Sequence, residues 1–334
     1  MIENIKNKIR EFGRIGVLLG GPSSEREISL RSGNAVCEAL RGGGYDIVAI
    51  DPNSSSLSDN AAGFIKEIRD ANITVAFIAL HGKFGEDGTV QKILELTDIP
   101  YTGSEPLASR LALDKISSRR VFESAGINVP QYRVFRRNQG LPPDVMKYPV
   151  VVKPAMSGSS IGLSVVKKQD ALKEALDAAF QHDEWVIIEQ YVDGREVTVG
   201  ILDDEPLPVI EIIPKEKIFD YHAKYTPDAT EYVVPALLER RLYQACQKAG
   251  LAAHKALDCR SFSRVDMIID TKNNTPVVLE VNTIPGLTAI SLLPKAAKAA
   301  GVDFLQLCEK LIYSAINSYE NKTSDACAQK EIRT

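Results

Sequence analysis

The chain has no long hydrophobic run and no excess of positive charge, and each absence excludes a class of protein. None of its hydrophobic stretches approaches the roughly 18 residues of a membrane span, and the N-terminal segment MIENIKNKIREFGR is too polar for a signal peptide. The net charge of −4 and the lack of a basic stripe argue against a nucleic-acid partner. We therefore expect neither a membrane nor a nucleic-acid partner.

The cysteines are too few and too scattered for a disulfide framework. Five occur in 334 residues, and no two have the CxxC spacing of a zinc or redox site. They are Cys37, Cys246, Cys259, Cys308 and Cys327. Such usage favours reduced thiols and a cytoplasmic location.

Two glycine motifs that would identify a nucleotide site are also missing. The segment 20–24, GGPSS, lacks GxGxxG spacing, which disfavours an NAD-dependent oxidoreductase. The segment 155–162, AMSGSSIG, lacks the GxxxxGK[ST] of a Walker A loop. Its small residues nevertheless let the backbone approach a phosphate, and Lys153 would add a positive charge there. A flexible hairpin turn is the alternative for this segment.

Strands and helices alternate over the N-terminal part of the chain. Hydrophobic runs at 15–19, 46–50, 74–80 and 99–102 predict strands, and helical spacing lies between them. This alternation predicts an α/β domain with a doubly wound parallel sheet, whose binding edge lies beyond the strand ends.

Two polar residues lie on that expected edge. Ser24 and Glu27 have capping-box spacing, so we expect a helix to open there with Glu25 in its first turn, where an acid complements the helix dipole. His81 directly follows the third predicted strand. The helix dipole alone would explain Glu25, and a structural role at the strand end would explain His81. A binding role is the alternative for each residue.

The segment 260–286 carries the strongest chemical pattern. Two β-rich runs flank the turn-forming residues DTKNNTP, which predicts a hairpin. Side chains alternate along a strand, so one face of the first strand carries Arg264, Asp266 and Ile268. The same rule gives the facing side chains of the second strand as Val278, Glu280 and Asn282.

The register of this hairpin would bring two carboxylates together. If the turn centres near Asn273, Asp266 lies opposite Glu280, and Arg264 lies opposite Asn282. Facing carboxylates repel each other unless a cation lies between them. Oxygen ligands of this kind suit Mg²⁺, which keeps coordination positions open for phosphate oxygens. A solvated sheet face with Arg264 as a salt-bridge partner is the alternative.

Three further segments complete the organisation. The strand 185–189 ends in Glu189, and a short crossing leads to Glu196; this arrangement could hold adenine or could be a surface hairpin. The segment 214–235 has weak periodicity and is expected to be a long loop that acts as a lid. The residues 319–334 are polar, and we expect a frayed tail.

The order of these motifs resembles that of bacterial D-alanine–D-alanine ligases of the ATP-grasp superfamily over residues 14–318. The stretches that carry the resemblance are VLLGGPSSEREISL at 17–30, ALHGKFGEDG at 79–88, YTGS at 101–104, DK at 114–115, VKPAMSGSSIG at 152–162, YHAKY at 221–225, RVDM at 264–267 and LEVNTIPG at 279–286. The resemblance implies a Rossmann-like domain at 1–105, followed by an ATP-grasp fold. Its two antiparallel-sheet lobes, at 106–188 and 189–318, would sandwich ATP, and 319–334 would be a tail.

The resemblance also implies a role for each matching residue. ATP would be contacted by Lys115, Lys153, Glu189, Gln190, Val192, Glu196 and Lys224. Two Mg²⁺ or Mn²⁺ ions would be held by Asp266, Glu280 and Asn282. The first D-alanine would meet Glu25, the second would meet Ser291 and Leu292, and His81 would lie near both. Arg264 and the Gly286 N–H would form an oxyanion site, and a hydrogen-bonded trio would tie the lid over the site: Glu25, Ser159 and Tyr225.

The reaction implied by the resemblance has two steps. The carboxylate of one D-alanine attacks the γ-phosphorus of ATP, which gives ADP and an acyl phosphate. The amine of the second D-alanine then displaces phosphate, and the dipeptide serves peptidoglycan precursor synthesis. Lactate-using relatives tend to have Phe where this chain has Tyr225, so D-alanine is the expected second substrate. A homodimer is also expected by resemblance.

Two other functions remain open at this point. A different ATP-grasp carboxylate–amine ligase would share the nucleotide residues but not the combination of Glu25, His81 and Tyr225. A nucleotide sensor without catalysis would be expected to lack Arg264 or a metal ligand, and the sequence retains them all.

Overall fold

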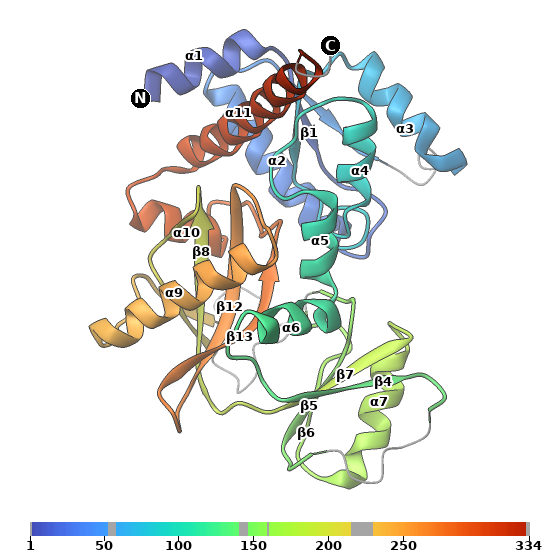
Figure 1. Ribbon diagram of the computed structural model, residues 1–334, viewed down its shortest axis with the longest axis vertical. Helices are drawn as coiled ribbons and strands as arrows, with labels where there is room; N and C mark the ends of the chain where they lie inside the picture. Colours follow the sequence, from blue (N-terminus) through green and yellow to red (C-terminus); the bar gives the residue numbers. More distant parts are fainter. Residues whose placement is uncertain (1, 53–57, 140–145, 159, 215–229, 332–334) are drawn as a thin grey trace.

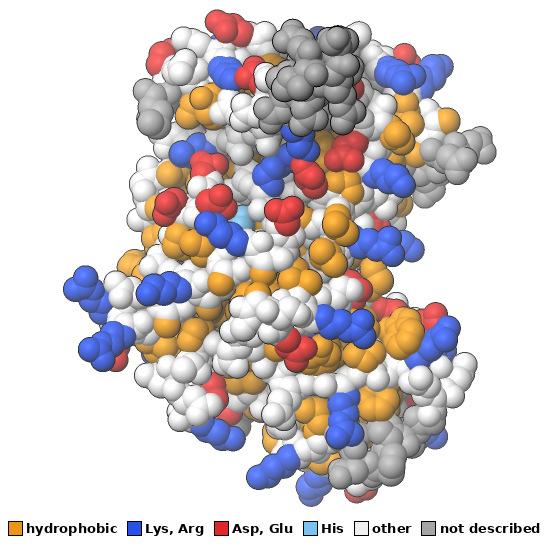
Figure 2. Space-filling model, in the orientation of Figure 1, with side chains coloured by type: hydrophobic (Ala, Val, Ile, Leu, Met, Phe, Trp, Pro, Cys, Tyr) orange, Lys and Arg blue, Asp and Glu red, His pale blue; other side chains and the backbone are white. Residues whose placement is uncertain are grey.

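The computed structural model describes residues 2–52, 58–139, 146–158, 160–214 and 230–331, and it contains three β-sheets packed against helices (Figure 1). A three-stranded parallel sheet lies at one end of the molecule, a four-stranded antiparallel sheet at the other, and a six-stranded antiparallel sheet between them. Within the described residues, no helix has both the length and the hydrophobicity to cross a membrane. Basic and acidic side chains are interspersed over the face shown in Figure 2.

The parallel sheet is covered by helices on both faces. Its strands pair in the order β2 (Ile47–Ile50), β1 (Ile15–Leu18), β3 (Val75–Ile78). The surrounding helices are α1 (Ile2–Phe12), α2 (Arg26–Gly42), α3 (Ser58–Asp70), α4 (Thr89–Leu96) and α11 (Phe304–Glu331). Side chains alternate along β1, so Val17 packs with α1, α2 and α11, while Leu18 packs with α3 and α4. The strand expected at 99–102 is reduced to one parallel bridge between Ala76 and Tyr101.

The helix α2 begins later than the capping-box spacing predicts. Its N-cap is Glu25, which makes no side-chain capping bond, and the Glu25 N–H donates to the Ser23 hydroxyl. The prediction that Ser24 caps this helix is therefore wrong. Glu25 therefore precedes the first turn of the helix, and its side chain is buried.

The six-stranded sheet contains the predicted hairpin. Its main path runs β11 (Thr230–Val233), β10 (Ile210–Pro214), β8 (Gly194–Leu202), β12 (Phe262–Asp270), β13 (Thr275–Asn282), and β9 (Glu205–Pro206) pairs with β8. Asp266 pairs with Glu280 and Arg264 pairs with Asn282, so the predicted register is confirmed. The helix α9 (Arg240–Ala256) covers the opposite, hydrophobic face of the hairpin.

One residue of the second hairpin strand faces the other way from the prediction. The pairing shifts between Asp266 and Met267, which leaves Leu279 as the extra residue of a β-bulge. Because a bulge reverses the alternation, Val278 packs in the hydrophobic cluster with Val281 and does not share a face with Glu280. The prediction that Val278 and Glu280 share a face is wrong for this reason.

Two segments that the sequence left without structure are regular elements. Residues 230–233 form β11, the edge strand, although 214–235 was expected to be loop throughout; residues 215–229 lie outside the described part of the chain. The expected frayed tail at 319–334 is helical to Glu331, because α11 continues through it. Two contacts to the N-terminal third of the chain anchor the start of this segment: Tyr319 donates to Asp98 Oδ2 at 3.1 Å, and Lys322 pairs with Glu105.

The four-stranded sheet pairs in the order β4 (Tyr132–Arg136), β7 (Trp185–Gln190), β5 (Val150–Pro154), β6 (Ser164–Val166), and all its pairs are antiparallel. The 3₁₀ turn η1 (Gln169–Ala171) leads into α7 (Leu172–Phe180), which packs on one face. Between this sheet and the parallel sheet lie α5 (Pro106–Leu113) and α6 (Lys115–Ser124) (Figure 1). The Asp114 carboxylate caps α6 by accepting from the Ile116 and Ser117 N–H groups.

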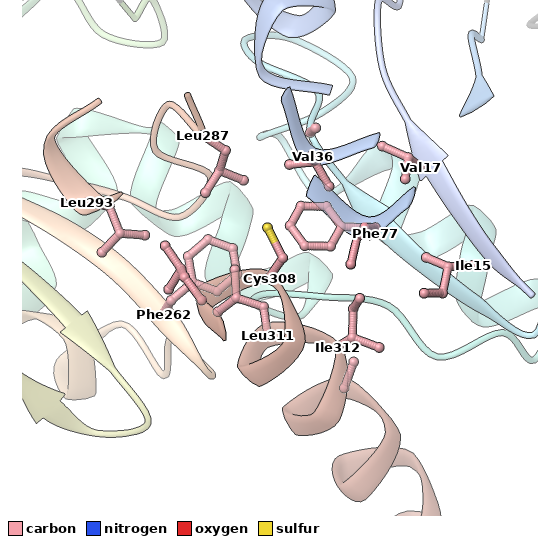
Figure 3. Close-up of a cluster of buried hydrophobic side chains, with 14 of the residues drawn as sticks. Ile15, Val17, Val36, Phe77, Phe262, Leu287, Leu293, Cys308, Leu311 and Ile312 are labelled. Atoms are coloured by element: carbon pink, nitrogen blue, oxygen red, sulfur yellow. The ribbon is translucent and has the colours of Figure 1, made fainter. Parts of the chain in front are cut away.

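A single hydrophobic cluster joins the parallel sheet to the six-stranded sheet (Figure 3). Val17 and Phe77 come from the parallel sheet, and Phe262 comes from the start of β12. In Figure 3, Cys308 of α11 lies between Phe262 and Phe77, and Leu293 of α10 (Leu292–Ala299) lies on the other side of Phe262. All five are buried, so this cluster fixes the hairpin against the loops that follow β1 and β3.

The buried cysteines give a direct test of this packing. Cys37, Cys246, Cys259 and Cys308 are free and buried, and burial raises the pKa of Cys246 to about 11 and that of Cys259 to about 12. Because the thiolate is the reactive form, we expect a Cys327→Ser variant to react with Ellman's reagent at about pH 8 only after denaturation. Absorbance of the released thiolate gives the number of cysteines that have reacted. Fast reaction of several thiols in the native protein would contradict the burial of these four cysteines.

Candidate functional site

Two cavities meet beside the hairpin. The larger cavity, of ≈ 790 Å³, lies between the parallel sheet and the hairpin, and it is lined by Glu25, His81, Arg264, Asn282, Gly286, Ser291 and Leu292 among others. The smaller cavity, of ≈ 440 Å³, lies between the two antiparallel sheets, and it is lined by Lys153, Glu189, Gln190, Val192, Glu196 and Asp266 among others. Lys115 and Glu280 line both cavities, so these two residues mark their junction.

The hairpin carboxylates are held by cations and a hydroxyl. Arg264 donates from Nε to Asp266 Oδ1 at 2.8 Å and from Nη2 to Asp266 Oδ2 at 2.7 Å. Thr198 of β8 donates its hydroxyl to the same Oδ1 at 2.6 Å. Lys115 Nζ lies 3.4 Å from Glu280 Oε2 and donates to the Ser157 carbonyl at 2.8 Å. The repulsion between the facing carboxylates is therefore offset by one cation on each.

This donor set fits a divalent metal. Asp266 and Glu280 supply carboxylate oxygens from neighbouring strands, and Asn282 adds an amide oxygen on the same side of the hairpin. Asn282 Oδ1 accepts from the Ile284 N–H at 3.0 Å. An amide oxygen has two lone pairs, so the same atom can also bind a metal ion. Among the described residues no third acid, His or Cys completes a cluster. A set of two carboxylates and an amide suits Mg²⁺ or Mn²⁺ bound together with phosphate oxygens.

A buried ion network forms the wall of the smaller cavity. Lys153 Nζ lies 2.8 Å from Glu189 Oε2, and Arg119 of α6 donates to Glu189 Oε1 from Nε at 3.0 Å and from Nη2 at 2.5 Å. Burial by itself would raise the pKa of Glu189, but Arg119 and Lys153 outweigh it and hold that pKa below its ordinary value. Burial lowers the pKa of Lys153. Glu189 is thus a fixed anion, and its position fixes the Lys153 ammonium at the cavity wall.

The polar side of the larger cavity is built from helix α2 and the loop that follows β3. His81 Nε2 lies 2.9 Å from Ser32 Oγ, and its Nδ1 lies 3.5 Å from Glu86 Oε1. The backbone N–H of His81 donates to Ser29 Oγ at 2.9 Å. Ser32 Oγ also accepts from the Leu287 N–H, so the histidine is linked through it to the loop after the hairpin.

The small-residue loop approaches Glu25. A methyl group placed on Gly158 would lie 3.1 Å from Glu25 Oε1, and one on Gly82 would lie 3.2 Å from the same oxygen. A larger side chain at either position would require the Glu25 carboxylate to shift by a few tenths of an ångström. Ser159, Lys224 and Tyr225, which were expected to complete this region, lie outside the described residues.

The loop after the hairpin closes the far side of the larger cavity. Ser291 is the N-cap of α10, and its Oγ accepts from the Thr288 N–H at 3.2 Å. A methyl group on Gly286 would lie 2.9 Å from this Oγ, so Ser291 and the Gly286 backbone are neighbours. Lys295, one turn along α10, lies over the Tyr232 ring at 4.0 Å.

Sequence reasoning missed three residues that hold the site. Thr198 and Arg119 were not singled out, because their partners lie 68 and 70 residues away in the chain. Ser32 lies on α2 and looks like an ordinary helical serine. Thr198 stands among apolar residues of a buried strand, which is an indirect signal, whereas Arg119 stands in a polar run that gives none.

Comparison with known proteins agrees with this geometry. Residues 121–313 match the family described as D-ala D-ala ligase C-terminus, and residues 52–104 match the D-ala D-ala ligase N-terminus family. The D-alanine–D-alanine ligase of Syntrophotalea carbinolica is 47% identical over 303 residues, which cover 90% of this chain and 96% of the relative. The ligase of Geobacter sulfurreducens is 46% identical over 305 residues, with 90% and 94% covered.

Solved structures of related proteins have the same fold. The D-alanine–D-alanine ligase of Bacillus anthracis complexed with ATP superposes with a TM-score of 0.81 at 36% identity, covering 93% of this chain and 99% of that one. The VanG D-Ala:D-Ser ligase of Enterococcus faecalis superposes with a TM-score of 0.75 at 33% identity, covering 90% and 99%. The mixed fold with two antiparallel sheets is therefore that of ATP-grasp ligases.

The hydroxyl on Asp266 can be tested by a matched pair of substitutions. Thr198→Val removes the hydroxyl at nearly constant volume, and we expect the free energy of unfolding to fall by about 1–3 kcal/mol, because a bond to a buried carboxylate is lost. Thr198→Ser keeps the hydroxyl and should retain more of that stability. Thermal melting compares the two variants, and equal melting temperatures for them would refute the contact.

Proposed function

The chain belongs to the D-alanine–D-alanine ligase family, and on that premise we propose that it joins two D-alanines through a D-alanyl phosphate intermediate. ATP is the co-substrate, and ADP and phosphate are released. The observation that carries the proposal is the junction of the two cavities at Lys115 and Glu280. A γ-phosphate bound on one side of that junction would face an amino-acid carboxylate on the other.

The smaller cavity is proposed to hold ATP. Adenine and ribose would contact Glu189, Gln190, Val192 and Glu196, and the phosphates would lie toward Lys153, Lys115 and Lys224. Asp266, Glu280 and Asn282 would hold two Mg²⁺ or Mn²⁺ ions at the phosphate end. Bound divalent cations neutralise the charge of the triphosphate. Support for this placement comes from the two sheets that enclose the cavity and from the ATP complex of the Bacillus anthracis relative.

The first step places one D-alanine in the larger cavity. Glu25 would bind the ammonium of this D-alanine, and the carboxylate of the D-alanine would then be directed toward the junction. Lys115 and Lys153 would offset the negative charge that gathers there as the carboxylate oxygen attacks the γ-phosphorus. Phosphoryl transfer requires little covalent chemistry from the protein, so alignment of the reactants and neutralisation of their charge supply most of the catalysis.

The second step forms the peptide bond. Ser291 and Leu292 would hold the second D-alanine, whose amine attacks the acyl carbon while phosphate leaves. Arg264 and the Gly286 N–H would stabilise the oxyanion, and His81 would lie beside the reacting groups. The acyl phosphate hydrolyses in water, so we also propose that Ser159 and Tyr225 close a lid by bonding with Glu25.

The finer organisation follows from the same family. We propose a doubly wound domain at 1–105 and two ATP-grasp lobes at 106–188 and 189–318. The dipeptide would serve peptidoglycan precursor synthesis in the cytoplasm, and the enzyme would act as a homodimer.

The direct test is a phosphate-release assay with ATP and Mg²⁺. D-alanine should support phosphate release and yield D-alanyl-D-alanine by mass spectrometry, whereas L-alanine should not. Adding D-lactate to D-alanine should give no depsipeptide. Removal of divalent cations with EDTA should abolish turnover, and Mg²⁺ or Mn²⁺ should restore it. The absence of phosphate release with D-alanine would refute the proposal.

The oxyanion role of Arg264 gives a second test. Arg264→Ala should lower kcat by about 10²–10³, because one preorganised donor is lost, while binding of an ATP analogue persists. Arg264→Lys keeps the charge and should lose less. Steady-state kinetics and calorimetry measure the two properties, and an unchanged kcat for the alanine variant would remove Arg264 from the mechanism.

A further inference from the structure

Arg119 is the largest fully buried side chain among the described residues, and its three donors point in two directions. Nε and Nη2 donate to Glu189 Oε1 on β7, in the four-stranded sheet. Nη1 donates to the Val278 carbonyl at 2.9 Å on β13, in the six-stranded sheet. One side chain of α6 therefore bonds to both sheets that enclose the smaller cavity.

Each end of this bridge lies next to a residue of the phosphate region. Glu189 holds the Lys153 ammonium through its other oxygen at 2.8 Å. Val278 adjoins the bulge, and Glu280 follows two residues later on the same strand. The chain of contacts thus runs from Lys153 through Glu189, Arg119 and Val278 to the strand of Glu280.

The strand β13 depends on this bridge because it is the edge of its sheet. At Val278, groups from outside the sheet take the place of a further strand. The Val278 N–H donates to the Asn128 carbonyl at 2.8 Å, and its own carbonyl accepts from Arg119. The Asn128 side chain also donates to the Pro276 carbonyl at 3.2 Å. Asn128 and Arg119 together hold this edge at the point where the bulge directs Glu280 toward the cavity.

We propose that Arg119 is a positioning residue, which holds Lys153 and the strand of Glu280 at a fixed separation so that both meet the triphosphate together. The proposal rests on the proposed function of the smaller cavity as the ATP site. Arg119 itself lies behind the cavity wall and does not line the cavity. Its effect reaches the nucleotide only through the residues that it holds.

The chemistry explains why an arginine stands here. A guanidinium carries five N–H donors in a planar fork, so it can bond a carboxylate and a carbonyl at once. A lysine has a single nitrogen on a flexible stem and cannot span both acceptors with the same geometry. A need for packing alone would be met by an apolar side chain, since buried ion pairs replaced by apolar groups are often neutral for stability.

The test compares Arg119→Lys with Arg120→Lys, an exposed neighbour on the same helix. Binding of Mg²⁺ with AMP-PNP, a nonhydrolysable ATP analogue, is measured by calorimetry, and KM values are measured for ATP and D-alanine. We expect Arg119→Lys to weaken AMP-PNP binding and raise the KM for ATP by about tenfold or more, the usual effect of losing a supporting partner. The KM for D-alanine should stay near the parental value, and Arg120→Lys should match the parent throughout.

A purely structural role predicts a different result. It would lower the melting temperature or the active fraction, while AMP-PNP affinity and all KM values in the folded protein stayed parental, and that result would overturn the proposal. Arg119→Gln provides a second variant, which keeps a donor for Glu189 but lacks the reach to Val278. It should show the same loss of AMP-PNP affinity, and parental affinity in either folded variant would count against Arg119. AMP-PNP binding is measured without D-alanine, so the two proposals can fail separately. If the unsubstituted protein binds AMP-PNP but releases no phosphate when D-alanine is added, the proposed function is refuted and the role of Arg119 is not.

Discussion

The structure depends on two carboxylates that face each other across one pair of strands. Carboxylates in directly paired positions of neighbouring strands repel each other. The fold offsets this repulsion by placing Arg264 beside Asp266 and Lys115 beside Glu280. Such an arrangement adds little stability of its own, since buried ion pairs can often be replaced by apolar groups without loss. The proposed binding of a divalent cation with its phosphates would account for these charges, and the neighbouring arginine and lysine would then serve the same anionic reaction centre.

The other parts of the molecule bring partners to this hairpin. The cluster around Phe262 joins the hairpin to the parallel sheet, so Glu25 and His81 from that sheet share a cavity with Asn282. On the opposite side the four-stranded sheet supplies Lys153 to the second cavity. Three sheets thus line two adjoining cavities, and under the proposed function each cavity would hold a different substrate.

Local patterns predicted the hairpin well and failed where tertiary contacts decide. Alternation and turn chemistry gave the pairing of Asp266 with Glu280, because both depend on neighbouring residues. The bulge at Leu279 follows no local signal, so Val278 was assigned to the wrong face. Arg119 stands in the polar run KISSRR, where a basic residue ordinarily faces solvent, and only the fold brings Glu189 to it. The helix through 319–331 likewise depends on distant anchors such as Asp98. Motif order, in contrast, identified the family correctly from the sequence.

The most direct measurement is a crystal structure of the protein soaked with Mn²⁺ and AMP-PNP, with anomalous diffraction recorded at a wavelength where manganese scatters strongly. The account predicts anomalous peaks bounded by Asp266, Glu280 and Asn282, in contact with the phosphates and beside the junction of the two cavities. Nucleotide density in the smaller cavity with no anomalous peak at these three side chains would contradict it.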